Sequence, residues 1–69
     1  MIEVFKTDVQ EAAVADRLLS VLQDHFPESR INFDLEDCDK ILRVAGGSFT
    51  AGKVVTLVNA HGFACVVLE

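Results

Sequence analysis

Hydrophobic and polar residues alternate with two different periods in the first half of the chain. Residues 2–7 and 31–35 follow a period of two that is typical of β-strands, and the strict alternation in 31–35 predicts a half-buried strand. Between them, apolar residues recur every three or four positions from Ala12 to Phe26. This spacing predicts an amphipathic helix, which Pro27 ends.

The second half predicts a further strand, helix and strand. Residues 40–44 are mostly apolar and should form a hairpin with the preceding strand around a short acidic turn. A helix is expected from Thr50 to His61, with Gly62 in the left-handed conformation that closes helices. Residues 63–68 then predict the last strand.

This order of elements is the ferredoxin-like, or split βαβ, pattern of the α+β class (βαββαβ). Right-handed crossovers should place two helices on one face of a four-stranded antiparallel sheet, with the first and third strands in the centre. Residues 1–69 are expected to form a single domain, since a chain of this length holds one core. Three connections should meet at one end of the sheet: the first strand-to-helix junction, the hairpin turn and the last helix-to-strand turn.

The junction after the first strand carries a pattern that predicts a helix start. Thr7 and Gln10 have the spacing of a capping box, and Asp8 and Glu11 would place negative charge in the first turn, where the helix dipole favours it. Carboxylates at that spacing would also suit harder metal ions such as Zn(II) or Mn(II). Both interpretations of the junction stay open here.

Charge and composition narrow the classes of function. A net charge of −5, from 11 acidic and 6 basic residues, argues against a nucleic-acid partner. No apolar run approaches the roughly 18 to 20 residues of a membrane span, and no secretory leader pattern opens the chain, so a cytoplasmic location is expected. The chain shows neither a serine, histidine and carboxylate set nor a glycine-rich phosphate loop, so we do not expect an enzyme.

The whole chain resembles a heavy-metal-associated domain, the fold of small copper chaperones and of the N-terminal modules of metal-pumping ATPases. The resemblance rests on length, element order and the segment 60–63, Ala-His-Gly-Phe, before the last strand. Residues 33–43 are also similar to a stretch of small bacterial proteins of this type. That family binds Cu(I) through C-x-x-C at the first junction, where residues 8–11 of this chain read Asp-Val-Gln-Glu. The resemblance therefore implies the fold and not the family's Cu(I) delivery.

The same end of the sheet nevertheless gathers candidate metal ligands. They comprise a thiol, an imidazole and several carboxylates, namely Cys38, His61, Asp8, Glu11, Asp37 and Asp39. One hypothesis is a rebuilt site for a transition-metal ion whose identity the sequence leaves open and which folding does not require. In the alternative interpretation the thiol lies under the turn, the imidazole caps its helix and the carboxylates are solvated.

The last strand suggests a different function. Residues 63–68 are apolar on both faces, and a strand at the edge of a sheet readily pairs with another strand. This predicts a homodimer or a protein partner that pairs with this edge, the alternative being a short, frayed strand. A disulfide between Cys38 and Cys65 is not expected, because the first strand separates them. The two hypotheses are thus a non-catalytic interaction module and a metal-binding protein.

Overall fold

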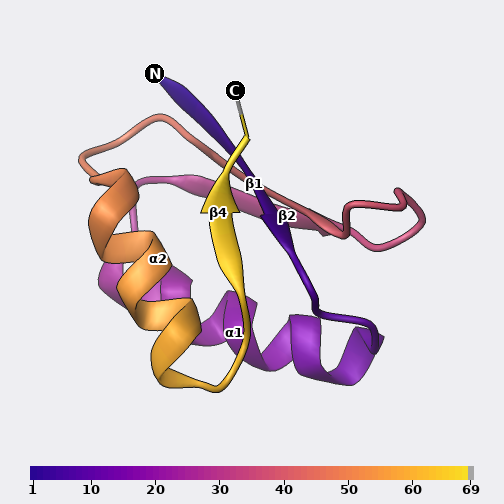
Figure 1. Cartoon of the computed structure of the whole chain (residues 1–69). Helices are drawn as coiled ribbons and strands as arrows, with labels where there is room; N and C mark the ends of the chain where they lie inside the picture. The colour runs from indigo at the N-terminus through magenta and orange to yellow at the C-terminus, as the bar shows by residue number, and fades with distance from the viewer. Residues whose placement is uncertain (69) are drawn as a thin grey trace.

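The computed structural model describes residues 1–68 (Figure 1), and Glu69, the last residue of the predicted domain, lies outside the described residues. The elements follow the predicted order, which confirms the ferredoxin-like βαββαβ fold. Their bounds are β1 Ile2–Thr7, α1 Ala12–His25, β2 Arg30–Asp34, β3 Ile41–Ala45, α2 Ala51–Ala60 and β4 Cys65–Val67.

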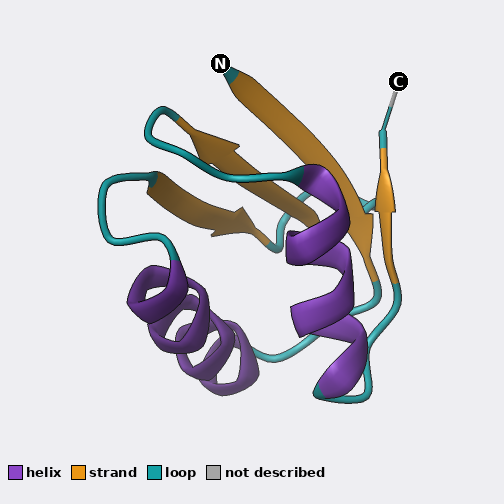
Figure 2. Cartoon of the chain, turned by 90° about the vertical axis from the view of Figure 1, so that its left-hand side faces the viewer, coloured by secondary structure: helices purple, strands orange, loops and turns teal. Residues whose placement is uncertain are grey.

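The four strands form one antiparallel sheet in the order β2-β3-β1-β4, so β1 and β3 are central as predicted. Both helices lie on the same face of the sheet, and the other face is open (Figure 2). Phe5 on β1 pairs with Leu42 on β3 and with Val67 on β4. Because side chains alternate along a strand, the odd-numbered residues of β1 and β4 point toward the helices and the even-numbered ones toward the open face.

The core lies between the sheet and the helices. Its fully buried side chains come from β1, β3 and both helices, and include Phe5, Leu22, Leu42, Val44, Val54 and Val58. On α1 the buried positions are Ala15, Leu18 and Leu22. These confirm the helical face that the spacing of apolar residues predicts.

The second helix matches its prediction closely. The Thr50 hydroxyl caps α2 by accepting a hydrogen bond from the Lys53 amide at 3.3 Å, and His61 follows the helix as its C-cap. Gly62 has a φ of 91°, the left-handed conformation that glycine adopts without steric cost. No helix within residues 1–68 is long and apolar enough to cross a membrane.

The predicted bounds of three strands, 31–35, 40–44 and 63–68, are wrong, since the strands are Arg30–Asp34, Ile41–Ala45 and Cys65–Val67. The last strand begins at Cys65 rather than Phe63, because the Phe63 amide still bonds to the Val58 carbonyl of α2 and the Ala64 amide bonds to the Asp8 carboxylate. The hairpin loop is also longer than the predicted turn and spans residues 35–40. Within it the Lys40 amide donates to the Asp37 carbonyl at 3.0 Å, so Lys40 belongs to the loop and not to β3.

Candidate functional site

The predicted helix start at Thr7 is wrong. Helix α1 begins at Ala12 with Glu11 as its N-cap, and the Glu11 side chain makes no capping hydrogen bond. The Thr7 side chain is engaged elsewhere, since its hydroxyl donates to the Lys40 carbonyl at 2.6 Å and accepts from the Val9 amide at 3.3 Å. No capping box with Gln10 therefore forms, and the first turn of α1 contains no acidic residue.

The residues after Thr7 tie the junction to the rest of the molecule. The Asp8 carboxylate accepts a hydrogen bond from the Ala64 amide at 2.8 Å, which links the junction to the entry of β4. Val9 is fully buried and packs in a small cluster with Ala15 and Leu18. The junction thus makes structural contacts through three consecutive residues, Thr7, Asp8 and Val9.

The hairpin loop lies beside this junction, as the topology predicts. The Thr7 amide donates to the Asp39 carbonyl at 3.1 Å, and Lys6 Nζ lies 3.7 Å from Asp39 Oδ1. Together with the contact between Asp8 and Ala64, these bonds show that the junction, the hairpin loop and the start of β4 share one end of the sheet. The predicted convergence of three connections is confirmed.

Only part of the predicted ligand set comes together at this end. Asp37, Cys38 and Asp39 offer ligand atoms within 4.8 Å of one another, and in the part of the chain that the structure describes they form the one such group. His61, at the end of α2, has its Nδ1 atom 2.9 Å from the Leu57 carbonyl, as the helix-capping interpretation expects. Asp8, Glu11 and His61 stand outside the group, so the candidate donors all come from one loop.

The two cysteines have opposite environments. Both are free thiols, as predicted, but Cys38 is exposed in the hairpin loop whereas Cys65 is buried in the core. Burial raises the pKa of the Cys65 thiol to about 11, because the charged thiolate is poorly solvated there. Cys65 is therefore a protonated core residue at neutral pH, and Cys38 is the accessible thiol.

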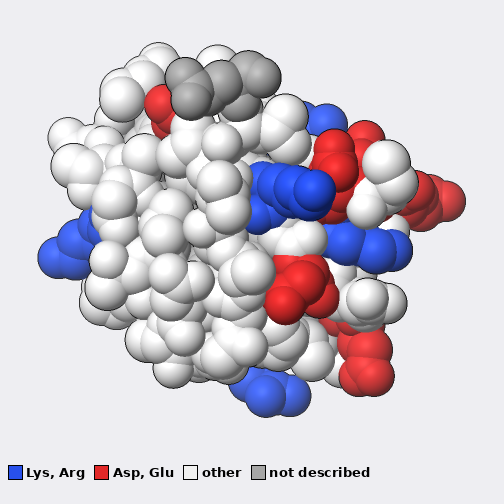
Figure 3. Space-filling model, viewed as in Figure 1, with Lys and Arg blue, Asp and Glu red and all other residues white. Residues whose placement is uncertain are grey.

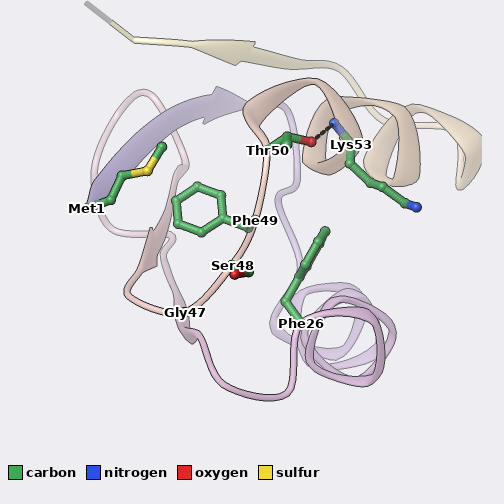
Figure 4. Close-up of a pocket in the computed structure, with 7 residues that line it drawn as sticks. All are labelled: Met1, Phe26, Gly47, Ser48, Phe49, Thr50 and Lys53. Atoms are coloured by element: carbon green, nitrogen blue, oxygen red, sulfur yellow. Dashed lines mark hydrogen bonds between the residues drawn. The ribbon is translucent and has the colours of Figure 1, made fainter.

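A hollow that the sequence did not reveal lies at the opposite end of the sheet (Figure 4). It has a volume of about 520 Å³ and is lined by Met1, Phe26, Gly47, Ser48, Phe49, Thr50 and Lys53. Phe26 and Phe49 contribute two aromatic rings to its wall, and Lys53 carries the one ionisable side chain among these residues. A hollow of this kind offers no acid and base pair for catalysis.

Charged residues are distributed unevenly over the molecule. Lys53 is the only one between Val44 and Leu68, and residues 54–68 contain no Asp, Glu, Lys or Arg. In the fold α2 packs beside β4, so residues 54–68 form a continuous region, here called the uncharged side. Figure 3 shows it as a mostly white surface, while coloured atoms gather around the hairpin loop.

Exposed apolar side chains lie on or next to the uncharged side. The large hydrophobic residues with the greatest exposure among residues 1–68 are Met1, Ile2, Val66 and Leu68. Val66 is 61% exposed on β4, and Ile2 is 62% exposed on the neighbouring strand β1. Farther from β4 the open face of the sheet becomes polar, with an ion pair between Arg43 and Asp34 at 4.0 Å. The apolar part of the open face therefore adjoins the β4 edge, beside the exposed Lys6 that pairs with Val66.

The free edge of β4 also presents unpaired main-chain groups. The Leu68 amide donates to the Val4 carbonyl at 2.8 Å, and hydrogen-bonded pairs alternate along an antiparallel ladder. Val66, which pairs with Lys6, therefore also directs its main-chain groups toward β1. It follows that the N–H and C=O groups of Cys65 and Val67 point away from the sheet, where the described residues supply no further strand.

Comparison of the chain with protein-family models, with curated proteins and with solved structures found no match. The molecule is defined by its own geometry as a ferredoxin-like α+β domain. It has two distinctive regions, the acidic hairpin loop that carries Cys38 and the uncharged side that carries the open edge of β4.

Proposed function

We propose that this chain is a non-catalytic, cytoplasmic protein-interaction module of the heavy-metal-associated type that has lost the thiolate pair. It binds a protein partner through the edge of β4 and the adjoining uncharged side, and it uses neither nucleic acid nor membrane. One observation carries the proposal. The open main-chain groups of Cys65 and Val67, the exposed Val66 side chain and the uncharged side all coincide on one edge of the molecule.

The energetics favour covering this edge. Each main-chain hydrogen bond that a partner strand supplies contributes about 0.5–1.5 kcal/mol net. Fully burying a valine side chain contributes about 1.5–3 kcal/mol, of which Val66 retains more than half because it is 61% exposed. Natural proteins protect edge strands by keeping them short or by charged residues, proline or bulges; β4 is short, with three residues, but it carries no charge, proline or bulge. A partner strand would provide that protection.

The contacts at the junction support an interaction module over a metal carrier built on residues 8–11. The Asp8 carboxylate holds the Ala64 amide, and Val9 is buried in the core. Metal binding by Asp8 and Glu11 would compete with the first of these contacts. The junction instead fixes the start of β4, and this orders the edge that the proposal uses.

The proposal is tested by site-specific photo-crosslinking in cells that express the protein. A photoreactive amino acid replaces Val66 in one variant and Ala13, an exposed residue of α1, in the control. We expect a covalent protein adduct from position 66 and none from position 13. The adduct from position 66 should be lost when the photoreactive variant also carries Ala64→Lys, because this change adds charge to the same edge. Equal adducts from both positions, or none from position 66, would rule out this surface as the binding site.

A second candidate function is metal binding at the hairpin loop, favoured by the proximity of Asp37, Cys38 and Asp39. One thiolate and two carboxylates suit Zn(II) or Co(II) better than Cu(I). Asp37 Oδ1 already accepts a hydrogen bond from the Asp39 amide at 2.9 Å, so an ion would compete with the structure of the loop.

A Co(II) titration tests this second function. Thiolate coordination would produce a charge-transfer band in the wild type that is absent in Cys38→Ser, whereas Ala13→Ser would serve as a matched surface control. Identical spectra for the wild type and Cys38→Ser would eliminate the loop as a metal site.

A further inference from the structure

We infer that the partner at the β4 edge is a second copy of this chain, paired antiparallel about a two-fold axis at Val66. The inference rests on the proposed function and names its partner. It joins two four-stranded sheets into one continuous sheet with all four helices on the same face.

Symmetry and charge select this edge for self-association. In a two-fold dimer each surface meets its own copy, so a charge near the axis faces a like charge. A chain with a net charge of −5 would repel itself through its acidic surfaces, whereas the uncharged side contributes no charge to such an interface. A foreign basic partner would instead find its complementary charges on the acidic hairpin loop around Asp37 and Asp39.

The nearest charge to the axis is compatible with this pairing. Lys6 lies on β1, opposite Val66 and one strand away from the edge. In the dimer the two Lys6 residues would be three strand spacings apart, or about 14 Å. This separation exceeds the Debye length of about 8 Å at physiological ionic strength, so their repulsion is largely screened.

The main-chain groups determine the register. Cys65 and Val67 direct their N–H and C=O groups outward, so both residues are used when Cys65 pairs with Val67 of the second copy and Val67 with its Cys65. A pairing centred on Cys65 or on Val67 would place that residue opposite its own counterpart. The other residue would then lie opposite a position outside β4. The favoured register places Val66 opposite Val66 on the open face and Leu68 opposite Ala64.

Side chains along the edge fit this register. Val66 faces its counterpart as a non-hydrogen-bonded pair, in which Cα atoms are about 4.5 Å apart and side chains make close contact. Next to β4, the exposed positions of α2 other than Lys53 are small or uncharged, namely Gly52, Thr56, Asn59 and Ala60. Apart from Lys53, neither the strand nor the exposed positions of the helix therefore present a charged side chain to a second copy.

Disulfide trapping tests both the partner and the register. A Cα separation of about 4.5 Å is within the range that a disulfide spans, so Val66→Cys should cross-link two copies under mild oxidation. The experiment is done in Cys38→Ser, because Cys38 is the exposed native thiol, with Cys38→Ser/Ala13→Cys as the matched control. We expect covalent dimers from position 66 at least ten times faster than from position 13.

Sedimentation measures the association without a cross-link. The wild type should show a monomer–dimer equilibrium, and Val66→Lys should raise its dissociation constant at least ten-fold while the urea midpoint of the diluted monomer stays unchanged. A monomer at every concentration together with equal cross-linking at positions 66 and 13 would overturn self-pairing. A dimer that Val66→Lys leaves intact would overturn it too, by placing the contact elsewhere. If the photo-crosslinked adduct from position 66 has the mass of a different protein, self-pairing fails while the interaction module stands.

Discussion

Replacing Thr7 by valine should destabilise the fold strongly, although the two side chains have nearly the same shape. Thr7 is 6% exposed, and its hydroxyl makes two hydrogen bonds, to the Lys40 carbonyl at 2.6 Å and from the Val9 amide at 3.3 Å. Valine can make neither bond. The change leaves one donor and one acceptor without a partner at the end of the sheet where three connections meet.

The expected cost follows from these two groups. A buried polar group without a partner costs about 1–3 kcal/mol, and the half-buried Lys40 carbonyl can recover part of its share from water, so Thr7→Val should cost about 2–4 kcal/mol. A domain of this length has a total stability of roughly 3–10 kcal/mol. Thr7→Ser keeps the hydroxyl and loses one methyl group, so it should cost only about 1 kcal/mol.

Urea denaturation followed by circular dichroism distinguishes the two variants. The slope of unfolding free energy against urea should stay constant while the midpoint shifts, and the shift should be at least twice as large for Thr7→Val as for Thr7→Ser. If Thr7→Ser is the more destabilising change, packing of the methyl group rather than hydrogen bonding holds the junction, and the reasoning is refuted.

Three further predictions concern other parts of the molecule. Gly47→Ala should be about 1–3 kcal/mol more destabilising than Gly46→Ala in urea denaturation. Both glycines have a φ near +70°, but only at Gly47 would a Cβ atom lie 2.8 Å from Ser29 Oγ. Equal losses of stability would contradict this clash. The pKa of the Cys65 thiol is about 11 in the fold against an ordinary 9.0, so the thiol loses its proton at lower pH in the unfolded chain. The free energy of unfolding of the wild type, relative to that of Cys65→Val, should therefore fall by up to about 2–3 kcal/mol between pH 9 and 11. A constant difference between the two proteins over this range would contradict the sign. Alkylation of the native protein at pH 8 should label Cys38 and leave Cys65 unlabelled until urea is added, as peptide mass analysis would show; equal labelling in the native state would contradict the burial of Cys65.

Sequence periodicity predicted the elements that local patterns specify. The apolar spacing from Ala12 to Phe26 located α1, and the Thr50 cap with Gly62 bounded α2 almost to the residue. Alternation in residues 31–35 identified β2. In each case the residues that carry the signal are neighbours in the chain, so the relevant physical interactions are local.

The errors arise where a distant segment competes for a local group. Thr7 has the spacing of a helix cap, but the carbonyl of Lys40, 33 residues away, takes its hydroxyl. Asp8 looks like a first-turn carboxylate, yet it bonds to the Ala64 amide 56 residues away. Neither preference is visible in a window of sequence, because both depend on how the sheet brings its connections together.

The candidate site was predictable to a similar extent. The apolar strand at the end of the chain indicated an edge that needs a cover, and the structure supplied the direction of its main-chain groups and the register that follows. The predicted gathering of metal ligands placed Asp37, Cys38 and Asp39 together because they are consecutive, whereas His61 is turned to its own helix at Leu57. Shared position at one end of a sheet did not bring side chains into ligand geometry.

Amide hydrogen exchange along β4, followed by NMR as the protein concentration is raised, tests the central claim most directly. In the monomer, the Val66 and Leu68 amides bond to β1 and should be protected, while those of Cys65 and Val67 should exchange freely. We predict that Cys65 and Val67 become protected as the protein associates, and that Val66→Lys abolishes this change. Association that leaves the exchange of Cys65 and Val67 unchanged would contradict the proposed use of the β4 edge.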